Sequence, residues 1–373
     1  MRKSIIVIVS LLVVLVVCFG CTVIGYLFFP IQKPAQIVEH DFPLQQKWCF
    51  ETAENIKSTP VGYNGQVFVR TNKNLYAVDA VTGELHWSNS LPIPSFPQPF
   101  LSPPLIQSEI VVTTSEDDIL AFNSKTGEQL WPNDNRSSAR RTFPSSANNE
   151  IVVIVGHAIE GRNLQSGELL WEIDRIESRR DPIAIIEGEY LYVFSRNQIR
   201  IFEVETGERI RMMPLYGWSS KGWFFEDTVF YFDNDGDGIS AFDVATRKTL
   251  WHRNDLPSVE YPMAKDSDKL IIGPYDGRPI AVNVVTGETI WQAQDVPVDI
   301  YQTPLIVEDT VYIRNLLQKA IYAIDSQSGD TIGYLELGNS SPMPTIFNFS
   351  LGPIEVETSI IFAVDNRLCA YGE

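Results

Sequence analysis

Cysteine and histidine are both scarce in this chain, at 4 residues each among 373. The histidines show no spacing typical of metal ligands, and no two cysteines are adjacent. The sequence also lacks a Gly-x-Ser-x-Gly elbow, a phosphate-cradling Gly-Lys loop and a His-Glu-x-x-His motif. These absences remove the usual sequence evidence for a hydrolase, a nucleotide-binding protein or a zinc peptidase.

Basic residues are few relative to acidic ones. Lys and Arg total 29 against 47 Asp and Glu, so the formal net charge is −18. A surface this acidic repels phosphate backbones, which argues against nucleic acid as a partner. Hydrophobic residues make up 44% of the chain, which is enough for a large core.

Long apolar runs are absent except at residues 1–30. Arg2 and Lys3 precede a charge-free run from Ile5 to Phe29, which ends at Pro30. As a helix this run would rise roughly 37 Å, enough to cross a hydrocarbon core of about 30 Å. We predict an uncleaved transmembrane anchor over residues 1–30, with a cytoplasmic N-terminus and an exported remainder. The alternative is a lipoprotein acylated at Cys21. Residues 31–46 have no clear period and are interpreted as a linker.

One motif recurs along the rest of the chain. A short strand ends in Ala-x-Asp, a Thr-Gly turn follows, and a second strand ends in Trp, as in residues 77–87. Glycine suits the turn because it adopts positive φ at little steric cost. The turn recurs about every 40 residues, with Arg247 once in place of glycine, at Gly83, Gly127, Gly167, Gly207, Gly287 and Gly329. This period predicts an all-β propeller of four-stranded blades.

Both chain ends carry parts of one further blade. Residues 359–364 and 367–371 predict two inner strands, and the chain stops before an outer one. Residues 47–51 predict an outer strand with nothing before it. Pairing the two parts would close the ring and remove both exposed edges. We therefore predict an eight-bladed propeller over residues 47–373, with the last blade closed by N- and C-terminal strands.

This closure bears on two cysteines. Aligning Trp48 with Trp87, and Ala370 with Ala77, makes Cys49 and Cys369 cross-strand neighbours. Such a pair can oxidise in an exported domain, so a disulfide that joins the chain ends is expected. A register slip of one residue would instead leave two separate buried thiols.

The motif Ala-x-Asp-x-x-Thr-Gly-x-x-x-Trp of residues 77–87 resembles the pyrroloquinoline-quinone (PQQ)-like β-propeller repeat. Residues 121–131 and 281–291 match it with Asn for Asp. The family includes quinoprotein alcohol dehydrogenases and a non-catalytic outer-membrane assembly lipoprotein of similar length and blade number. The resemblance covers residues 47–373 and implies that the motif tryptophan docks on the neighbouring blade. It therefore implies a structural role for Trp87, Trp131, Trp171, Trp251 and Trp291.

The quinoprotein enzymes are usually longer, and they carry an adjacent cysteine pair and a calcium site. This chain has no adjacent cysteines, so the resemblance favours a non-catalytic member. Asp233, Asp235 and Asp237 are candidate calcium ligands because alternating carboxylates can surround a hard cation. They align without insertion on residues 69–74, an ordinary hairpin, so a plain turn is the favoured interpretation.

The segments that join one blade to the next carry the remaining candidates. Arginines fall in two successive segments and aromatic residues in the next three, a composition typical of interaction hot spots. The alternative is that these side chains are simply solvated. The candidate partner-binding residues are Arg136, Arg140, Arg141, Arg179, Arg180, Trp218, Tyr261 and Tyr301.

Taken together, the sequence predicts a membrane-anchored extracytoplasmic propeller that acts as a protein-binding scaffold without a cofactor. A role in cell-envelope assembly follows from the resemblance alone. The alternative is a small-molecule sensor or a PQQ-dependent dehydrogenase that uses the central channel, with PQQ or calcium bound.

Overall fold

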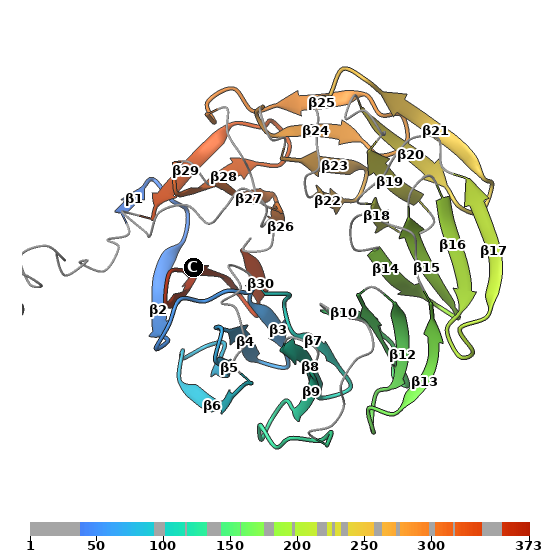
Figure 1. Cartoon of the computed structure of the whole chain (residues 1–373). Coiled ribbons are helices and arrows are strands. Elements are labelled where there is room, and N and C mark those ends of the chain that lie inside the picture. The colour runs from blue at the N-terminus through green and yellow to red at the C-terminus, as the bar shows by residue number, and fades with distance from the viewer. Residues whose placement is uncertain are drawn as a thin grey trace, which may run out of the picture. The chain divides into compact units, whose positions relative to one another are not determined.

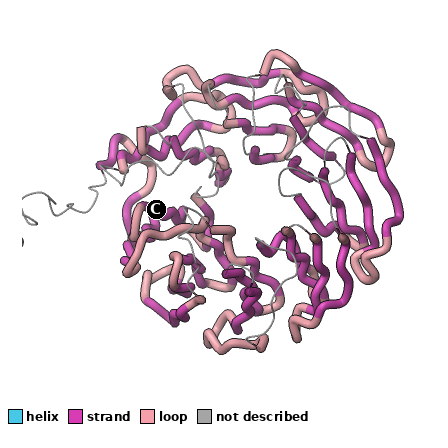
Figure 2. The backbone as a smooth tube through the Cα atoms, in the orientation of Figure 1, coloured by secondary structure: helices cyan, strands magenta, loops and turns pink. Residues whose placement is uncertain are grey.

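The computed structural model of the chain describes residues 38–92, 101–115, 118–132, 143–156, 158–174, 183–195, 198–214, 222–225, 228–232, 238–256, 263–273, 277–297, 303–315, 318–337 and 353–373. The predicted anchor, residues 1–30, and Cys21 lie outside these ranges. Within the described ranges, no helix has the length and hydropathy to span a membrane. All named elements of the structure are β-strands (Figure 2).

Residues Ile37–Glu373 form one compact unit in which eight antiparallel sheets follow each other around a ring (Figure 1). The predicted eight-bladed all-β propeller is confirmed. The innermost strands of blades 1 to 8 are β3 (Val61–Tyr63), β7 (Leu105–Gln107), β10 (Phe143–Ala147), β14 (Ile183–Glu187), β18 (Gly222–Phe225), β22 (Met263–Asp266), β26 (Leu305–Val307) and β30 (Ile354–Val356). The second strands are β4 (Gln66–Arg70), β8 (Ile110–Ser115), β11 (Ile151–Val155), β15 (Tyr190–Ser195), β19 (Thr228–Phe232), β23 (Lys269–Ile272), β27 (Thr310–Asn315) and β31 (Ser359–Val364).

The third and outer strands complete the blades. The third strands are β5 (Asn74–Asp79), β9 (Asp118–Asn123), β12 (Ile159–Asn163), β16 (Gln198–Glu203), β20 (Ile239–Asp243), β24 (Ile280–Asn283), β28 (Ala320–Asp325) and β32 (Arg367–Gly372). The outer strands are β6 (Leu85–Ser90) in blade 1, β13 (Leu169–Ile173) in blade 3, β17 (Arg209–Pro214) in blade 4, β21 (Lys248–Arg253) in blade 5, β25 (Thr289–Gln292) in blade 6, β29 (Thr331–Glu336) in blade 7 and β2 (Gln45–Glu51) in blade 8.

The hydrophobic core lies between the blades. Successive side chains of a strand point to opposite faces of its sheet, so the second and third strands bury both faces against neighbouring blades. Val67 and Val69 pack with Ile361 of blade 8, whereas Phe68 between them packs with Val111 of blade 2. Burial of each such side chain contributes about 1.5–3 kcal/mol. Apolar clusters of this kind fill seven successive seams, from blades 8 and 1 to blades 6 and 7.

Blade 2 departs from the predicted four strands. Its described part has three, and the outer position holds only a single bridge between Phe122 and Gln129. Pro132 directly follows Trp131. Proline has no N–H to donate to a ladder, so an outer strand like that of blade 1 cannot continue through this position.

Blade 7 has a fifth strand that the sequence did not predict. β1 (Val38–His40) pairs antiparallel with β29 along its outer edge, with Val38 opposite Glu336 and His40 opposite Tyr334. A Cβ atom added to Gly333 of β29 would lie 2.2 Å from the carbonyl oxygen of Asp41. Residues 31–46 are therefore not all linker, because a free sheet edge supplies backbone partners to a segment with no pattern of its own.

Tryptophan side chains fasten six of the eight blades to the next blade. The indole N–H of Trp171 donates to the carbonyl oxygen of Val204 at 2.8 Å, and its ring lies against the turn glycine Gly207 of blade 4. A Cβ atom added to Gly207 would lie 2.7 Å from that ring, so the turn must be glycine. Equivalent indole hydrogen bonds are made by Trp48, Trp87, Trp131, Trp251 and Trp291.

The seam between blades 4 and 5 lacks both partners of this contact. Arg211 pairs with Ile201 at the position of the tryptophan, and Arg247, with a φ of 60°, takes the position of the turn glycine. The two replacements are physically linked, because a Cβ atom in the turn would collide with a docked indole ring. Apolar packing of Met213 against Val229 and Tyr231 still joins these blades.

Substituting both positions should rebuild the missing contact. Arg247→Gly alone should stabilise the protein by about 1 kcal/mol, because it removes a side chain from a left-handed conformation. Arg211→Trp alone should gain nothing, since the Arg247 Cβ blocks the ring. In a double-mutant cycle measured by urea unfolding, the gain in free energy of unfolding of the double variant should exceed the sum of the two single gains by about 1–3 kcal/mol. Strict additivity would contradict the linkage.

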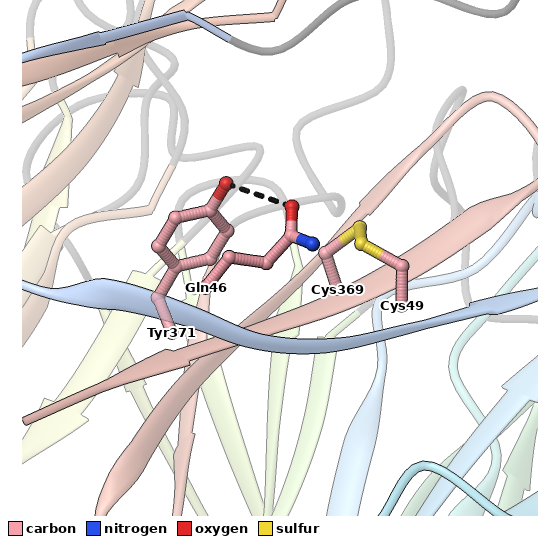
Figure 3. Close-up of a disulfide and its surroundings, with 4 residues drawn as sticks. All are labelled: Gln46, Cys49, Cys369 and Tyr371. Carbon is pink, nitrogen blue, oxygen red and sulfur yellow. Dashed lines mark hydrogen bonds between the residues drawn. A yellow bond between two sulfur atoms is a disulfide. The ribbon is translucent and has the colours of Figure 1, made fainter.

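Ring closure occurs in blade 8. β2 pairs with β32, and Cys49 lies directly opposite Cys369. The two cysteines form a disulfide with their Cα atoms 4.1 Å apart (Figure 3). Beside it, the hydroxyl of Tyr371 and the side-chain oxygen of Gln46 lie 3.3 Å apart in a hydrogen bond. The cross-link thus joins strands 320 residues apart in the sequence.

Candidate functional site

The candidate partner-binding residues belong to segments that lead from the outer position of one blade to the inner strand of the next. All blades share one strand order, so the described strand ends that flank these segments lie on one face of the ring, here called the connection face. The segments follow Pro132, β13, β17, β21 and β25. The candidates themselves lie outside the described residues: Arg136, Arg140, Arg141, Arg179, Arg180, Trp218, Tyr261 and Tyr301.

Two arginines that sequence reasoning missed lie at strand ends toward the connection face, Arg70 buried and Arg314 partly buried. Arg70 Nη1 donates to Thr113 Oγ1 at 2.6 Å and to the carbonyl oxygen of Thr114 at 2.7 Å. Arg314, at the equivalent position of blade 7, donates to the carbonyl oxygen of Ala363 at 3.0 Å. Burial lowers the pKa of each to about 10, so both stay charged at neutral pH. The sequence feature that could have identified them is an arginine at the end of an otherwise apolar strand.

These arginines join adjacent blades near the inner strands, as the tryptophans do at the rim. Arg70 connects blade 1 to blade 2, and Arg314 connects blade 7 to blade 8. Arg70 is only 2% exposed, so it is not available to a partner. At the seam of blades 1 and 2, Arg70 and Trp87 thus hold the two blades together at an inner and an outer position.

The opposite face of the ring, here called the turn face, carries the Asp/Asn-x-x-Thr-Gly turns. The Asp79 carboxylate accepts hydrogen bonds from the backbone N–H groups of Thr82 and Val81, at 2.7 and 2.9 Å. These bonds, that of Thr82 first, hold the pKa of Asp79 below its usual range. Backbone bonds lower the pKa of Asp243 and Asp325 in the same way. The carboxylates therefore brace the turns in their ionised form.

The turn face is also strongly anionic. In six blades an exposed acid follows the turn glycine, namely Glu84, Glu128, Glu168, Glu208, Glu288 and Asp330. In blade 5, Lys248 takes this place. Like charges around one face repel an anionic partner and attract a cationic one.

The described residues hold no group of three or more His, Cys, Asp or Glu side chains placed to bind a metal ion. Asp233, Asp235 and Asp237 lie outside the described residues. His86 lies 2.6 Å from Gln66 Nε2, and His252 lies 3.0 Å from Ser240 Oγ. Each of these histidines is thus engaged within its own blade.

Comparison with known proteins gives one family. The family described as outer membrane protein assembly factor BamB matches residues 45–251 and 155–367. The chain is 27% identical over 259 residues to outer membrane protein assembly factor BamB of Burkholderia pseudomallei, covering 61% of this chain and 65% of that protein. The match thus spans less than two thirds of this relative's length.

Two further comparisons concern a solved structure of the same fold and an enzyme. The crystal structure of BamB from Moraxella catarrhalis superposes with a TM-score of 0.66 at 12% identity, over 88% of this chain and all of that one. Quinohemoprotein alcohol dehydrogenase ADH IIB of Pseudomonas putida is 32% identical, but over only 24% of this chain and 15% of its own length. The enzyme-like similarity is thus partial, whereas the assembly-factor match spans nearly the whole propeller. The chain belongs to the outer membrane protein assembly factor BamB family.

Proposed function

We propose that this chain is a non-catalytic, extracytoplasmic scaffold that binds protein partners during outer-membrane assembly. The observation that carries the proposal is the family match, which runs from residue 45 to residue 367. A ring whose blades are fastened by indole contacts, arginine hydrogen bonds and a disulfide is suited to present a surface without changing shape. The work of such a protein is to hold partners in a defined arrangement.

Anchoring and compartment form part of the same proposal. Residues 5–29 serve as a membrane anchor with the propeller outside the cytoplasm, and acylation at Cys21 is the alternative. A disulfide between Cys49 and Cys369 supports an oxidising compartment, because cytosolic thiols are kept reduced. The PQQ-like repeats then supply architecture rather than chemistry.

A second candidate function is favoured by one observation, the partial similarity to quinohemoprotein alcohol dehydrogenase ADH IIB. In that case the propeller would bind a small molecule or PQQ in its central channel. A native mass spectrum and an absorbance spectrum of the purified protein distinguish the two. A retained chromophore would support the enzyme, and a bare mass after loading attempts with PQQ and calcium would support the scaffold.

The partner face can be tested by charge reversal. Arg140→Glu/Arg141→Glu, and separately Arg179→Glu/Arg180→Glu, should lower the yield of partner crosslinked in native membranes by about tenfold. The control is Lys47→Glu/Lys125→Glu, an equal charge change on an outer strand and on the turn face. Equal crosslinking yields in all three variants would refute the connection face as the docking surface.

A further inference from the structure

The rim at the seam between blades 4 and 5 is cationic in an otherwise acidic protein. Arg209 and Arg211 belong to β17, and Arg247 and Lys248 form the facing turn of blade 5, where six other blades have a small residue and an acid. All four side chains are exposed. In the described part of the chain, none of these four side chains takes part in a hydrogen bond or ion pair.

The same strand exposes apolar side chains. Ile210 and Met212 are 52% and 55% exposed, which makes them the most exposed large hydrophobic residues on any described outer strand. Met213, next to them, is buried in the seam. β17 therefore presents cationic and apolar side chains at alternate positions along its length. Natural interfaces are enriched in Arg and Met.

The outer edge of this propeller accepts an added strand. Among the described outer strands only β17 and β29 lack the docking tryptophan, having Arg211 and Gly333 in its place. β29 is covered by β1, which pairs with it residue by residue. β17 lies at the rim and ends its sheet (Figure 1), as β2, β6, β13, β21 and β25 end theirs, so its outward N–H and C=O groups have no strand partner within the described residues. What distinguishes β17 from these strands is the exposed pair Arg209 and Arg211.

We propose that β17 is a docking edge for an extended, acidic segment of a protein partner, which adds to blade 4 as a fifth strand. Backbone hydrogen bonds supply the pairing, as between β1 and β29. Carboxylates of the segment meet Arg209, Arg211, Arg247 and Lys248, and arginine forks suit carboxylates in particular. Alternate apolar side chains of the segment cover Ile210 and Met212.

The charge of the edge also selects the partner. Two copies of β17 would place arginines against arginines, so the edge resists self-association while it attracts an acidic strand. The described residues of this edge form no site for a thiolate, a nucleotide or a metal ion. An open strand edge pairs with the backbone of another polypeptide. The inference rests on the proposed function only in taking the partner to be a protein.

Fluorescence anisotropy with the whole protein tests this directly. The probe is a labelled heptapeptide that alternates glutamate and valine, and the comparison probes alternate lysine and valine or carry a central proline. The acidic peptide should bind, and Arg209→Glu/Arg211→Glu should weaken it about tenfold or more. Lys47→Glu/Lys125→Glu should retain binding within about twofold, since its charges lie elsewhere. Hydrogen exchange should slow at the amides of β17 when the peptide binds.

Each other outcome overturns the proposal. No binding of the acidic peptide, equal binding of the lysine peptide, or undiminished binding of the proline peptide would each exclude an added acidic strand. Vesicles of anionic phospholipid that bind more tightly than the peptide, with the same loss in Arg209→Glu/Arg211→Glu, would assign the edge to a membrane surface instead. The variants at Arg140, Arg141, Arg179 and Arg180 should leave peptide binding unchanged, which separates this edge from the connection face.

Discussion

Replacing both ring-closing cysteines, as Cys49→Ser/Cys369→Ser, is expected to lower the free energy of unfolding by about 4–5 kcal/mol. The cross-link spans 320 residues of sequence, so it removes a large loop-closure entropy from the unfolded chain. It also lies in blade 8, whose outer strand comes from the N-terminal part of the chain and whose other three strands come from the C-terminal part. Without it, closure depends on the β2–β32 and β1–β29 ladders and on the contacts of Trp48 and Thr52.

The measurement is urea unfolding of the oxidised protein and of the serine variant. Reduction of the unsubstituted protein should reproduce the loss, and reduction of the variant should change nothing further. Peptide mapping of the unreduced protein should find Cys49 and Cys369 linked. A loss below about 1 kcal/mol, or both thiols free in the oxidised protein, would show that hydrogen bonds and packing alone close the ring.

Trp171→Ala is expected to destabilise the propeller by about 3–5 kcal/mol. The indole is 9% exposed and packs with Ile159, Leu191 and Val193 across the seam of blades 3 and 4. The substitution removes that apolar contact and the N–H bond to Val204, and it leaves a cavity over Gly207. Because neighbouring blades are stable only through their shared seam, the damage should reach beyond one blade.

Neighbouring substitutions make this prediction specific. Leu170→Ala, one residue away but 45% exposed, should change the free energy of unfolding by no more than about 0.5 kcal/mol. The loss of stability in Trp171→Phe should fall between those of Trp171→Ala and Leu170→Ala, because phenylalanine retains an aromatic ring. Loss of the indole hydrogen bond alone should cost about 1–2 kcal/mol. Equal stabilities of Trp171→Ala and Leu170→Ala would contradict the docking role of the indole.

The repeated turns made the number of blades predictable. In most blades a turn glycine and a tryptophan mark the positions of the third and outer strands, and the alternation of apolar side chains allows only one register with both faces buried. The same alignment put Cys49 opposite Cys369, because blade 8 repeats the pairing of Tyr76 with Ser88 in blade 1. Local pattern and global fold agree here, so sequence was sufficient.

Other features depended on contacts between parts of the chain that no local pattern encodes. β1 forms because β29 offers a free edge and Gly333 leaves room for the chain to cross it. Arg211 and Arg247 look like two unrelated departures from the motif until the contact of Trp171 with Gly207 shows that their positions touch in the other seams.

By itself, the sequence determined the all-β class, the eight blades and the ring closure, because these follow from periodic side chains and from turn chemistry within each repeat. Only the tertiary structure decided that the edge of blade 7 is covered, that Arg70 and Arg314 join neighbouring blades, and that Arg211 and Arg247 meet at an open rim. Those properties depend on contacts between residues that are distant in sequence. A local sequence pattern does not show which distant residues will share the same space or the same backbone partners.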